Sequence, residues 1–196
     1  EFADWCFQRL KGFSQYGFPE SHAASFALLV YASAWLKYEY PAVFAAALLN
    51  SQPLGFYAPP QIVRDAKEHG VDVRAVDVQH SEWDCTLEES GRAIRLGMRL
   101  VNGLRETAAQ AIVQAARKDG PYPSPIELWL SSGVPASTLR TLALADAFTS
   151  MGLDCQHALW EVQSLHGKPL PLLDSRFTQT NPAETSQLPR VSEMSK

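Results

Sequence analysis

Cysteine is scarce in this chain of 196 residues. The three cysteines, at positions 6, 85 and 155, form no Cys-x-x-Cys pair and no spacing typical of a zinc site. Such wide spacing argues against a disulfide framework or a structural metal and favours a reduced protein. Long apolar runs are also missing, because the longest, residues 23–36, contains two serines and is shorter than the roughly 20 residues that span a bilayer. We therefore expect no membrane segment and a cytoplasmic location.

The numbers of acidic and basic residues are nearly equal. The 21 Asp and Glu residues slightly outnumber the 17 Lys and Arg residues, for a net charge of -4, which taken alone argues against a nucleic-acid partner. The distribution is uneven, however. Residues 65–89 hold eight acidic side chains against two basic ones, whereas residues 92–118 hold six basic side chains against one acidic one. Charge runs usually form solvated faces, but binding depends on where charges lie, so the basic segment is a candidate binding region.

Residues that would carry out chemistry are absent as well. The sequence has no Asp-x-Asp pair for two-metal phosphoryl transfer, no phosphate-binding loop and no nucleophile–base pair. The aspartates at positions 65, 72, 77 and 84 are scattered, and we interpret them as solvated surface charges. We expect no catalytic and no metal-binding residue in this chain, and a free-standing metabolic enzyme is disfavoured.

Apolar periodicity predicts a mainly α-helical fold. Helices are expected over residues 2–10, 22–38, 41–50, 61–69, 106–118, 135–147 and 154–165, with Ser21 as the cap of the second. A short extended stretch within residues 71–78 is expected to pair with residues 93–96 across the acidic turn at 88–91. From Gly167 onward Pro, Ser, Thr and Gln dominate, which is typical of a linker or a disordered tail.

The second and third expected helices are apolar on nearly every side and must be buried on several sides. The sequence begins with Glu1, inside an expected helix, so we interpret the chain as a fragment of a longer protein that lacks some neighbours of these helices. Four tryptophans lie among aliphatic residues at helical spacing and are predicted to pack in a core: Trp5, Trp35, Trp129 and Trp160.

Two glycine-containing hairpins lie about thirty residues apart, each before an expected helix. The first contains Gly103, Leu104 and Arg105, and the second contains Gly133 and Pro135. Glycine permits close backbone approach, and a helix N-terminus favours a phosphate. The pair resembles a tandem helix-hairpin-helix arrangement, which tracks duplex backbones without reading sequence. Arg105 stands where a second glycine is usual and Pro135 removes an N–H donor, so either unit alone fits an ordinary packing corner equally well.

The segment Gly17-Phe18-Pro19-Glu20-Ser21-His22-Ala23-Ala24-Ser25-Phe26-Ala27 and the segments after it carry a more specific likeness. They resemble the late fingers region of bacterial C-family DNA polymerases, the replicative alpha-subunit family, in the form typical of its error-prone branch. The resemblance covers roughly residues 1–162. Further matching segments are Leu49-Asn50-Ser51-Gln52-Pro53-Leu54-Gly55-Phe56-Tyr57, Trp83-Asp84-Cys85-Thr86-Leu87, Arg95-Leu96-Gly97-Met98-Arg99, Ala145-Asp146-Ala147-Phe148 and Gln156-His157-Ala158-Leu159-Trp160.

The resemblance implies a nucleotide-binding role for Ser21 and His22. Replicative relatives carry Asn-Lys-Ser-His at this point, near the phosphates of the incoming nucleotide, and this chain carries Pro19-Glu20-Ser21-His22. Glu20 would repel a triphosphate where the relatives have lysine. The alternative for His22 is a helix-start histidine packed against Phe18 or Phe26.

The expected organisation is therefore the end of a fingers domain with a short β connector over residues 1–87, a tandem helix-hairpin-helix domain over residues 88–166, and a linker or disordered tail over residues 167–196. The resemblance implies an error-prone DNA polymerase whose catalytic aspartates and Mg²⁺ lie outside this chain, so the chain alone should be inactive. It also implies the partners of such an enzyme: template–primer duplex, a deoxynucleoside triphosphate, the sliding clamp and other translesion-synthesis proteins. The residues expected to contact DNA backbones are Arg99, Gly103, Leu104, Arg105, Arg117, Lys118 and Gly133.

A second hypothesis is a non-catalytic protein-interaction module whose degenerate hairpins pack against a partner, with the acidic segment facing a basic protein. The positions of the arginines discriminate between the two. If those between Arg92 and Lys118 gather on one face with Gly103, DNA binding is favoured, and if they scatter, protein interaction gains.

Overall fold

The computed structural model describes residues 2–14, 20–55 and 57–165, so the expected tail over 167–196 lies outside the described residues. Two compact units make up the chain: Glu1–Arg74 with Cys85–Arg95, and Ala75–Asp84 with Leu96–Lys196. This division does not coincide with a single boundary at residues 87 and 88. The reason is that residues 85–95 complete a sheet with the first unit, whereas residues 75–84 pack within the second.

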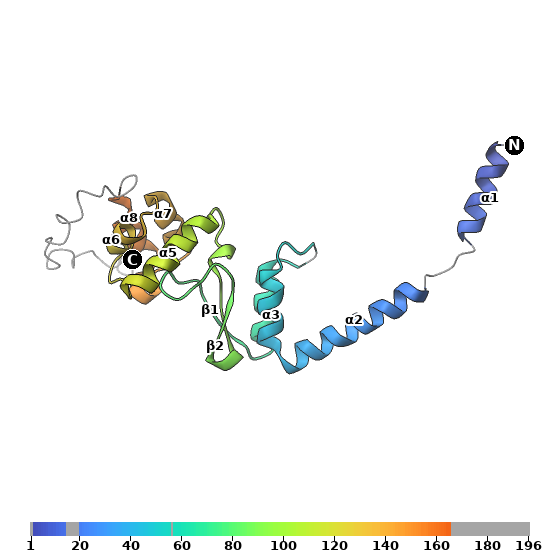
Figure 1. Ribbon diagram of the computed structural model, residues 1–196, viewed down its shortest axis with the longest axis horizontal. Coiled ribbons are helices and arrows are strands. Elements are labelled where there is room, and N and C mark those ends of the chain that lie inside the picture. Colours follow the sequence, from blue (N-terminus) through green and yellow to red (C-terminus); the bar gives the residue numbers. More distant parts are fainter. Residues whose placement is uncertain (1, 15–19, 56, 166–196) are drawn as a thin grey trace, which may run out of the picture. The chain divides into compact units, whose positions relative to one another are not determined.

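The first unit is helical up to a small sheet (Figure 1). Its helices are α1 (Phe2–Ser14), α2 (Glu20–Glu39), α3 (Pro41–Asn50) and α4 (Pro59–Glu68). Helix α2 begins one residue before Ser21, so Ser21 lies in the first turn and does not cap the helix as expected. Both α3 and α4 begin with proline, which fits the first turn because the N–H that it lacks has no helical partner there.

The core of the first unit forms around α3. Buried side chains recur on one face of this helix at the spacing of a helical stripe, namely Ala42, Ala45, Ala46 and Leu49. Helix α3 contacts α4 and the strands β2 and β3, and Ile94 of β3 is fully buried. The small alanine side chains allow the helix backbone to approach the sheet closely.

The sheet has three short strands, β1 (Asp72–Arg74), β2 (Thr86–Glu88) and β3 (Ala93–Arg95), in the order β1-β3-β2. Strand β1 pairs with β3 in parallel, with Val73 opposite Ile94, and β2 pairs with β3 antiparallel across the turn at Glu89–Gly91. The expected pairing of these two stretches is confirmed, but the hairpin partner across the acidic turn is β2, a strand that the sequence did not predict.

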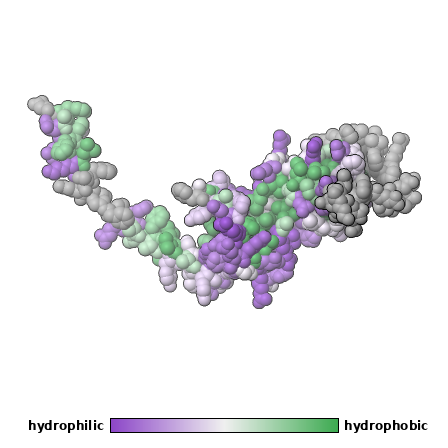
Figure 2. All heavy atoms as spheres, turned by 180° about the vertical axis from the view of Figure 1, so that it is seen from behind, coloured by the Kyte–Doolittle hydropathy of each residue, from purple (hydrophilic) through white to green (hydrophobic). Residues whose placement is uncertain are grey.

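The prediction that Trp5 and Trp35 lie in a core is wrong for this chain. Their side chains are 57% and 50% exposed, and no residue of α2 is buried. Figure 2 shows hydrophobic side chains along the surface of this helix. The physical reason is that α2 is apolar on nearly every side, while the described residues leave most of its surface uncovered. No helix among the described residues is long and apolar enough to cross a membrane.

The second unit is a helical domain. It contains the single 3-10 turns η2 (Met98–Leu100) and η3 (Thr149–Met151) and the helices α5 (Glu106–Asp119), α6 (Pro125–Ser132), α7 (Ala136–Leu144) and α8 (Cys155–Gln163). Three of these helices agree with the expected ranges to within a few residues, and α6 was not expected. Its sequence includes Ser124, whose hydroxyl accepts from the Glu127 N–H, and Pro125 at the first position, both ordinary signals of a helix start.

One apolar core joins all four helices of the second unit. Its fully buried members include Met98, Ile112, Leu128, Leu139, Leu142 and Phe148. Burial of each such side chain stabilises the fold by about 1.5–3 kcal/mol relative to exposure. Trp129 is buried in this core as expected, but Trp160, on the outer face of α8, is 64% exposed, so its predicted burial is wrong. The structure confirms the predicted fold class: mainly α-helical with a short β connector.

Candidate nucleic-acid interface

The two hairpins of the second unit share a local design. Each contains a glycine with positive φ, then an apolar residue directed to the core, then a residue in extended conformation that caps a helix. In the first hairpin these are Gly103 (φ +81°), Leu104 and Arg105 before α5. In the second they are Gly133 (φ +65°), the buried Val134, and Pro135 before α7. The equivalence supports the interpretation of the pair as tandem helix-hairpin-helix units.

Gly103 and Gly133 have different structural roles. Gly103 occupies the third position of a turn in which the Leu104 N–H donates to the Val101 carbonyl at 3.2 Å, and this position favours glycine because its φ is positive. Gly133 ends α6, with its N–H donating to the Trp129 carbonyl at 3.1 Å, in the left-handed conformation common after a helix. The first hairpin follows only the single turn η2, whereas the second joins two α-helices.

A groove of about 550 Å³ brings the two hairpins together. The N-termini of α5 and α7 both contribute to it, and the first backbone N–H groups of a helix have no partner within the helix. Helix N-termini carry partial positive charge and bind phosphate groups. The groove is lined by Gly103, Arg105, Thr107, Ala108, Ala111, Ser132, Gly133, Val134, Pro135, Ser137, Thr138 and Thr141.

Hydroxyl groups are the part of this groove that sequence reasoning missed. Ser137, Thr138 and Thr141 recur on one face of α7 at the spacing of three and four residues, and Thr107 lies at the start of α5. This spacing immediately after a hairpin glycine was the available signal. Hydroxyls donate hydrogen bonds without charge. The hydroxyls of Ser132 and Thr141 already donate to backbone carbonyls of their own helices. The described groove lining therefore offers Thr107, Ser137 and Thr138 as candidate neutral donors, with Arg105 as its cation.

The other predicted cations are not part of the groove lining. Arg99 donates to Asp84 at 2.7 Å, and Arg117 donates to Glu82, both within the second unit. Lys118 is exposed in the last turn of α5. In the first unit Arg95 donates to Glu88 at 2.9 Å. Some of the arginines between residues 92 and 118 therefore lie in the first unit and the others in the second. Three of these arginines pair with carboxylates of the acidic segment. The opposite charges of the two sequence segments largely cancel in the fold.

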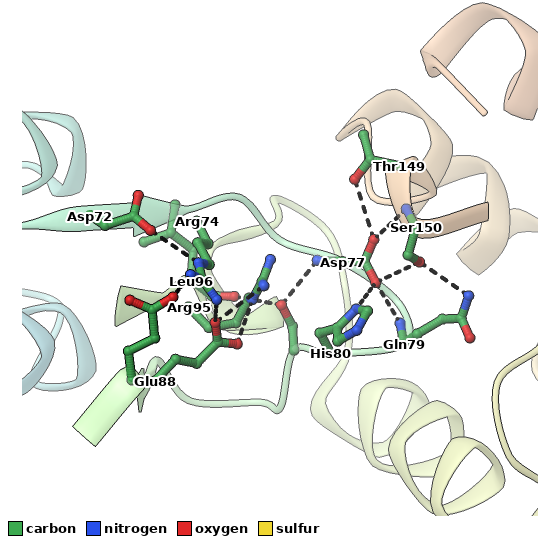
Figure 3. Close-up of polar contacts among 12 residues, drawn as sticks. Asp72, Arg74, Asp77, Gln79, His80, Glu88, Arg95, Leu96, Thr149 and Ser150 are labelled. Carbon is green, nitrogen blue, oxygen red and sulfur yellow. Dashed lines mark hydrogen bonds and ion pairs between the residues drawn. The ribbon is translucent and has the colours of Figure 1, made fainter. Parts of the chain in front are cut away.

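Asp77 corrects the expectation that the aspartates are solvated. Its side chain is 4% exposed and accepts hydrogen bonds from the Gln79 N–H at 2.9 Å, the Ser150 N–H at 3.0 Å and the Ser150 hydroxyl at 2.8 Å (Figure 3). His80 Nδ1 lies 2.9 Å from the same carboxylate. Burial raises the pKa of Asp77, but these hydrogen bonds outweigh it, so the pKa lies below its ordinary value of 3.8. The carboxylate ties residues 77–81 to η3 within the second unit.

Ser21 and His22, predicted from the resemblance to lie near the nucleotide, are exposed in the first turn of α2. The His22 ring packs against Phe26, with 4.4 Å between ring centroids, which is the contact expected under the alternative. No group of three or more His, Cys, Asp or Glu side chains in the described ranges could hold a metal ion.

Comparisons with known proteins give one family match and several relatives. Residues 70–158 match the family described as helix-hairpin-helix motif. The chain is 56% identical over 177 residues to "Error-prone DNA polymerase 2" of Rhizobium meliloti, with 88% of this chain and 16% of the relative covered. This chain is homologous to one segment of the error-prone DNA polymerases. Two further such polymerases are 52% identical, from Agrobacterium fabrum (92% of this chain, 17% of the relative), and 46% identical, from Mesorhizobium japonicum (97% and 19%).

These matches confirm the resemblance to the error-prone branch. The chain spans less than a fifth of the length of these polymerases. The match to the helix-hairpin-helix family lies mostly within the second unit and includes both hairpins of the groove. The scattered arginines, taken alone, strengthen the protein-interaction hypothesis. The relatives do not favour it.

Proposed function

We propose that this chain forms the segment of an error-prone DNA polymerase that holds the template–primer duplex behind the active site. The observation that carries the proposal is the single groove formed by both hairpins, with the N-termini of α5 and α7 lining it together. Two helix N-termini facing one groove suit two phosphate groups of a nucleic-acid backbone. Such contacts carry no sequence information, as a polymerase that moves along its template requires.

Arg105 and the backbone of the two hairpins are the proposed main contacts. The first backbone N–H groups of α5 and α7, close to Gly103 and Gly133, approach the phosphates, and Arg105 supplies charge. Lys118, exposed at the far end of α5, adds a peripheral contact. Arg99 and Arg117, which carboxylates hold, contribute less than their sequence positions suggest.

The start of α2 is proposed to form part of the outer wall of the nucleotide pocket in the whole polymerase, through Ser21 and His22. The two Mg²⁺ ions of the reaction and the aspartates that hold them would belong to other parts of the enzyme, and the sliding clamp and translesion partners would bind the whole protein in the cytoplasm. The exposed apolar surface of α2 is proposed to pack against the remainder of the polymerase. Exposed apolar surface of this extent is typical of an interaction site.

A salt titration of duplex binding tests the proposal. Fluorescence anisotropy of a labelled template–primer duplex is measured with the 196-residue chain between 50 and 200 mM salt. Arg105→Ala is expected to weaken binding and to reduce the slope of log K against log salt by about 0.9, the value for one lost phosphate contact.

Arg64→Ala is the matched control, because it removes the same charge from an exposed position of the first unit and should leave the slope unchanged. Absence of binding at 50 mM salt, or equal slopes for Arg105→Ala and the wild-type chain, would contradict the proposal.

A further inference from the structure

Residues 81–84 lie beside residues 96–99 in the second unit. The Met98 N–H donates to the Glu82 carbonyl at 2.8 Å, and the Arg99 N–H donates to the Trp83 carbonyl at 3.0 Å. The Ser81 hydroxyl also donates to the Leu96 carbonyl at 2.7 Å. Backbone hydrogen bonds therefore fix the position of the acidic residues Glu82 and Asp84 next to the segment that enters the first hairpin.

Each of these acids holds one cation of the basic segment. Asp84 accepts from Arg99 at 2.7 Å, and Glu82 accepts from Arg117. Arg99 lies four residues before Gly103, and Arg117 lies about three helical turns beyond Arg105 along α5. One pair therefore holds an arginine that precedes the first hairpin in the sequence, and the other holds an arginine that follows it.

Stability does not explain these pairs. The side chains of Asp84, Glu82 and Arg117 are 55%, 49% and 67% exposed and that of Arg99 is 24% exposed, so each pair has at least one largely exposed member. Ion pairs at such exposure contribute about 0–1 kcal/mol to folding. A cation that neutralises a phosphate, in contrast, adds about 0.9 to the salt slope of DNA binding.

We infer that Asp84 and Glu82 restrain the affinity of the second unit for DNA by occupying Arg99 and Arg117. This inference rests on the proposed function. With these cations neutralised, binding depends on the neutral donors of the groove and on Arg105. The duplex is then held by the hairpins and released readily, instead of adhering through general positive charge. Asp84 and Glu82 thus limit how strongly the second unit as a whole binds a nucleic-acid backbone.

The test compares Asp84→Asn and Glu82→Gln with Glu127→Gln, which makes the same change in net charge at an exposed position of α6. Duplex affinity of the 196-residue chain is measured at 50 and 200 mM salt. Asp84→Asn and Glu82→Gln are each expected to bind more tightly and to increase the ratio of the two affinities about threefold, from a slope steeper by about 0.9. Glu127→Gln should leave the ratio unchanged.

A double-variant comparison links the effect to the pair. Asp84→Asn made in an Arg99→Ala background is expected to give no increase in slope, because the cation that the aspartate holds is gone. If the wild-type chain binds duplex but Asp84→Asn and Glu82→Gln give the same salt dependence as Glu127→Gln, this inference alone is overturned. Absence of duplex binding by the wild-type chain and by every variant would overturn the proposed function and the inference together. Circular dichroism melting confirms that each variant is folded.

Discussion

Replacing Asp77 with asparagine removes the charge from a buried carboxylate that accepts several hydrogen bonds within the second unit. Asparagine keeps one oxygen, which can still accept from the Gln79 N–H and the Ser150 hydroxyl. Its amide group then meets the Ser150 N–H, a donor that lies 3.0 Å from the second carboxylate oxygen. Two donors cannot hydrogen-bond each other, so the substitution leaves a partly buried N–H without its acceptor.

The expected cost follows from these contacts. An unsatisfied buried donor costs about 1–3 kcal/mol, and loss of the carboxylate charge weakens the bond between His80 Nδ1 and the retained oxygen by about 1 kcal/mol. We expect Asp77→Asn to lower the free energy of unfolding by about 2–4 kcal/mol. Because the folded pKa of Asp77 lies below 3.8, the aspartate stabilises the fold above that pH and loses this contribution as the pH falls through its folded pKa. The difference between wild type and variant should therefore shrink below pH 3.8.

Urea unfolding followed by circular dichroism measures both effects. Asp154→Asn is the matched control, since Asp154 also accepts from a histidine three residues later, but its side chain is 63% exposed. Asparagine caps helices about as well as aspartate, so the control should lose less than about 0.5 kcal/mol. A loss below about 1 kcal/mol for Asp77→Asn, or a difference that persists unchanged at pH 2.5, would refute the reasoning.

Three further predictions concern the hairpin, the apolar helix and the chemistry. Gly103→Ala should cost about 1–2 kcal/mol through its positive φ and weaken duplex binding, whereas Gly70→Ala, with φ +80° in the first unit, should cost as much and leave duplex affinity unchanged. The exposed apolar surface of α2 should make the isolated chain self-associate, and Trp35→Asp, which places a charge on this surface, should reduce self-association in sedimentation velocity. Equal sedimentation of variant and wild type would contradict this. The chain with Mg²⁺, primed template and nucleotides should extend no primer in a gel assay, and any extension would show that its own residues catalyse transfer.

Local patterns predicted the described helices other than α6, because each depends on neighbouring residues. The stop of α3 at Asn50 and the start of α5 at Glu106 follow from proline, glycine and apolar spacing. The hairpins were recognised on the same basis, since a glycine with positive φ before a helix is a local requirement. The residues of both hairpins could therefore be named from sequence.

Features that depend on distant partners could not be predicted. The parallel pairing of β1 with β3 joins Val73 to Ile94, and no local signal distinguishes it from a hairpin. Asp77 resembles the other scattered aspartates in sequence, and only its packing against Ser150 makes it buried. The charge runs were visible, but their mutual neutralisation requires the fold that places Asp84 beside Arg99.

We propose that both hairpins bind one DNA duplex through a shared groove. Titration of the ¹⁵N-labelled chain with a template–primer duplex, followed by amide chemical shifts, tests it most directly. We expect the amides of residues 103–108 and of 133–138, apart from Pro135, which has none, to shift together with one affinity, while those of α3 and α4 stay unchanged. Shifts confined to one hairpin, or spread over the first unit without the hairpins, would contradict it.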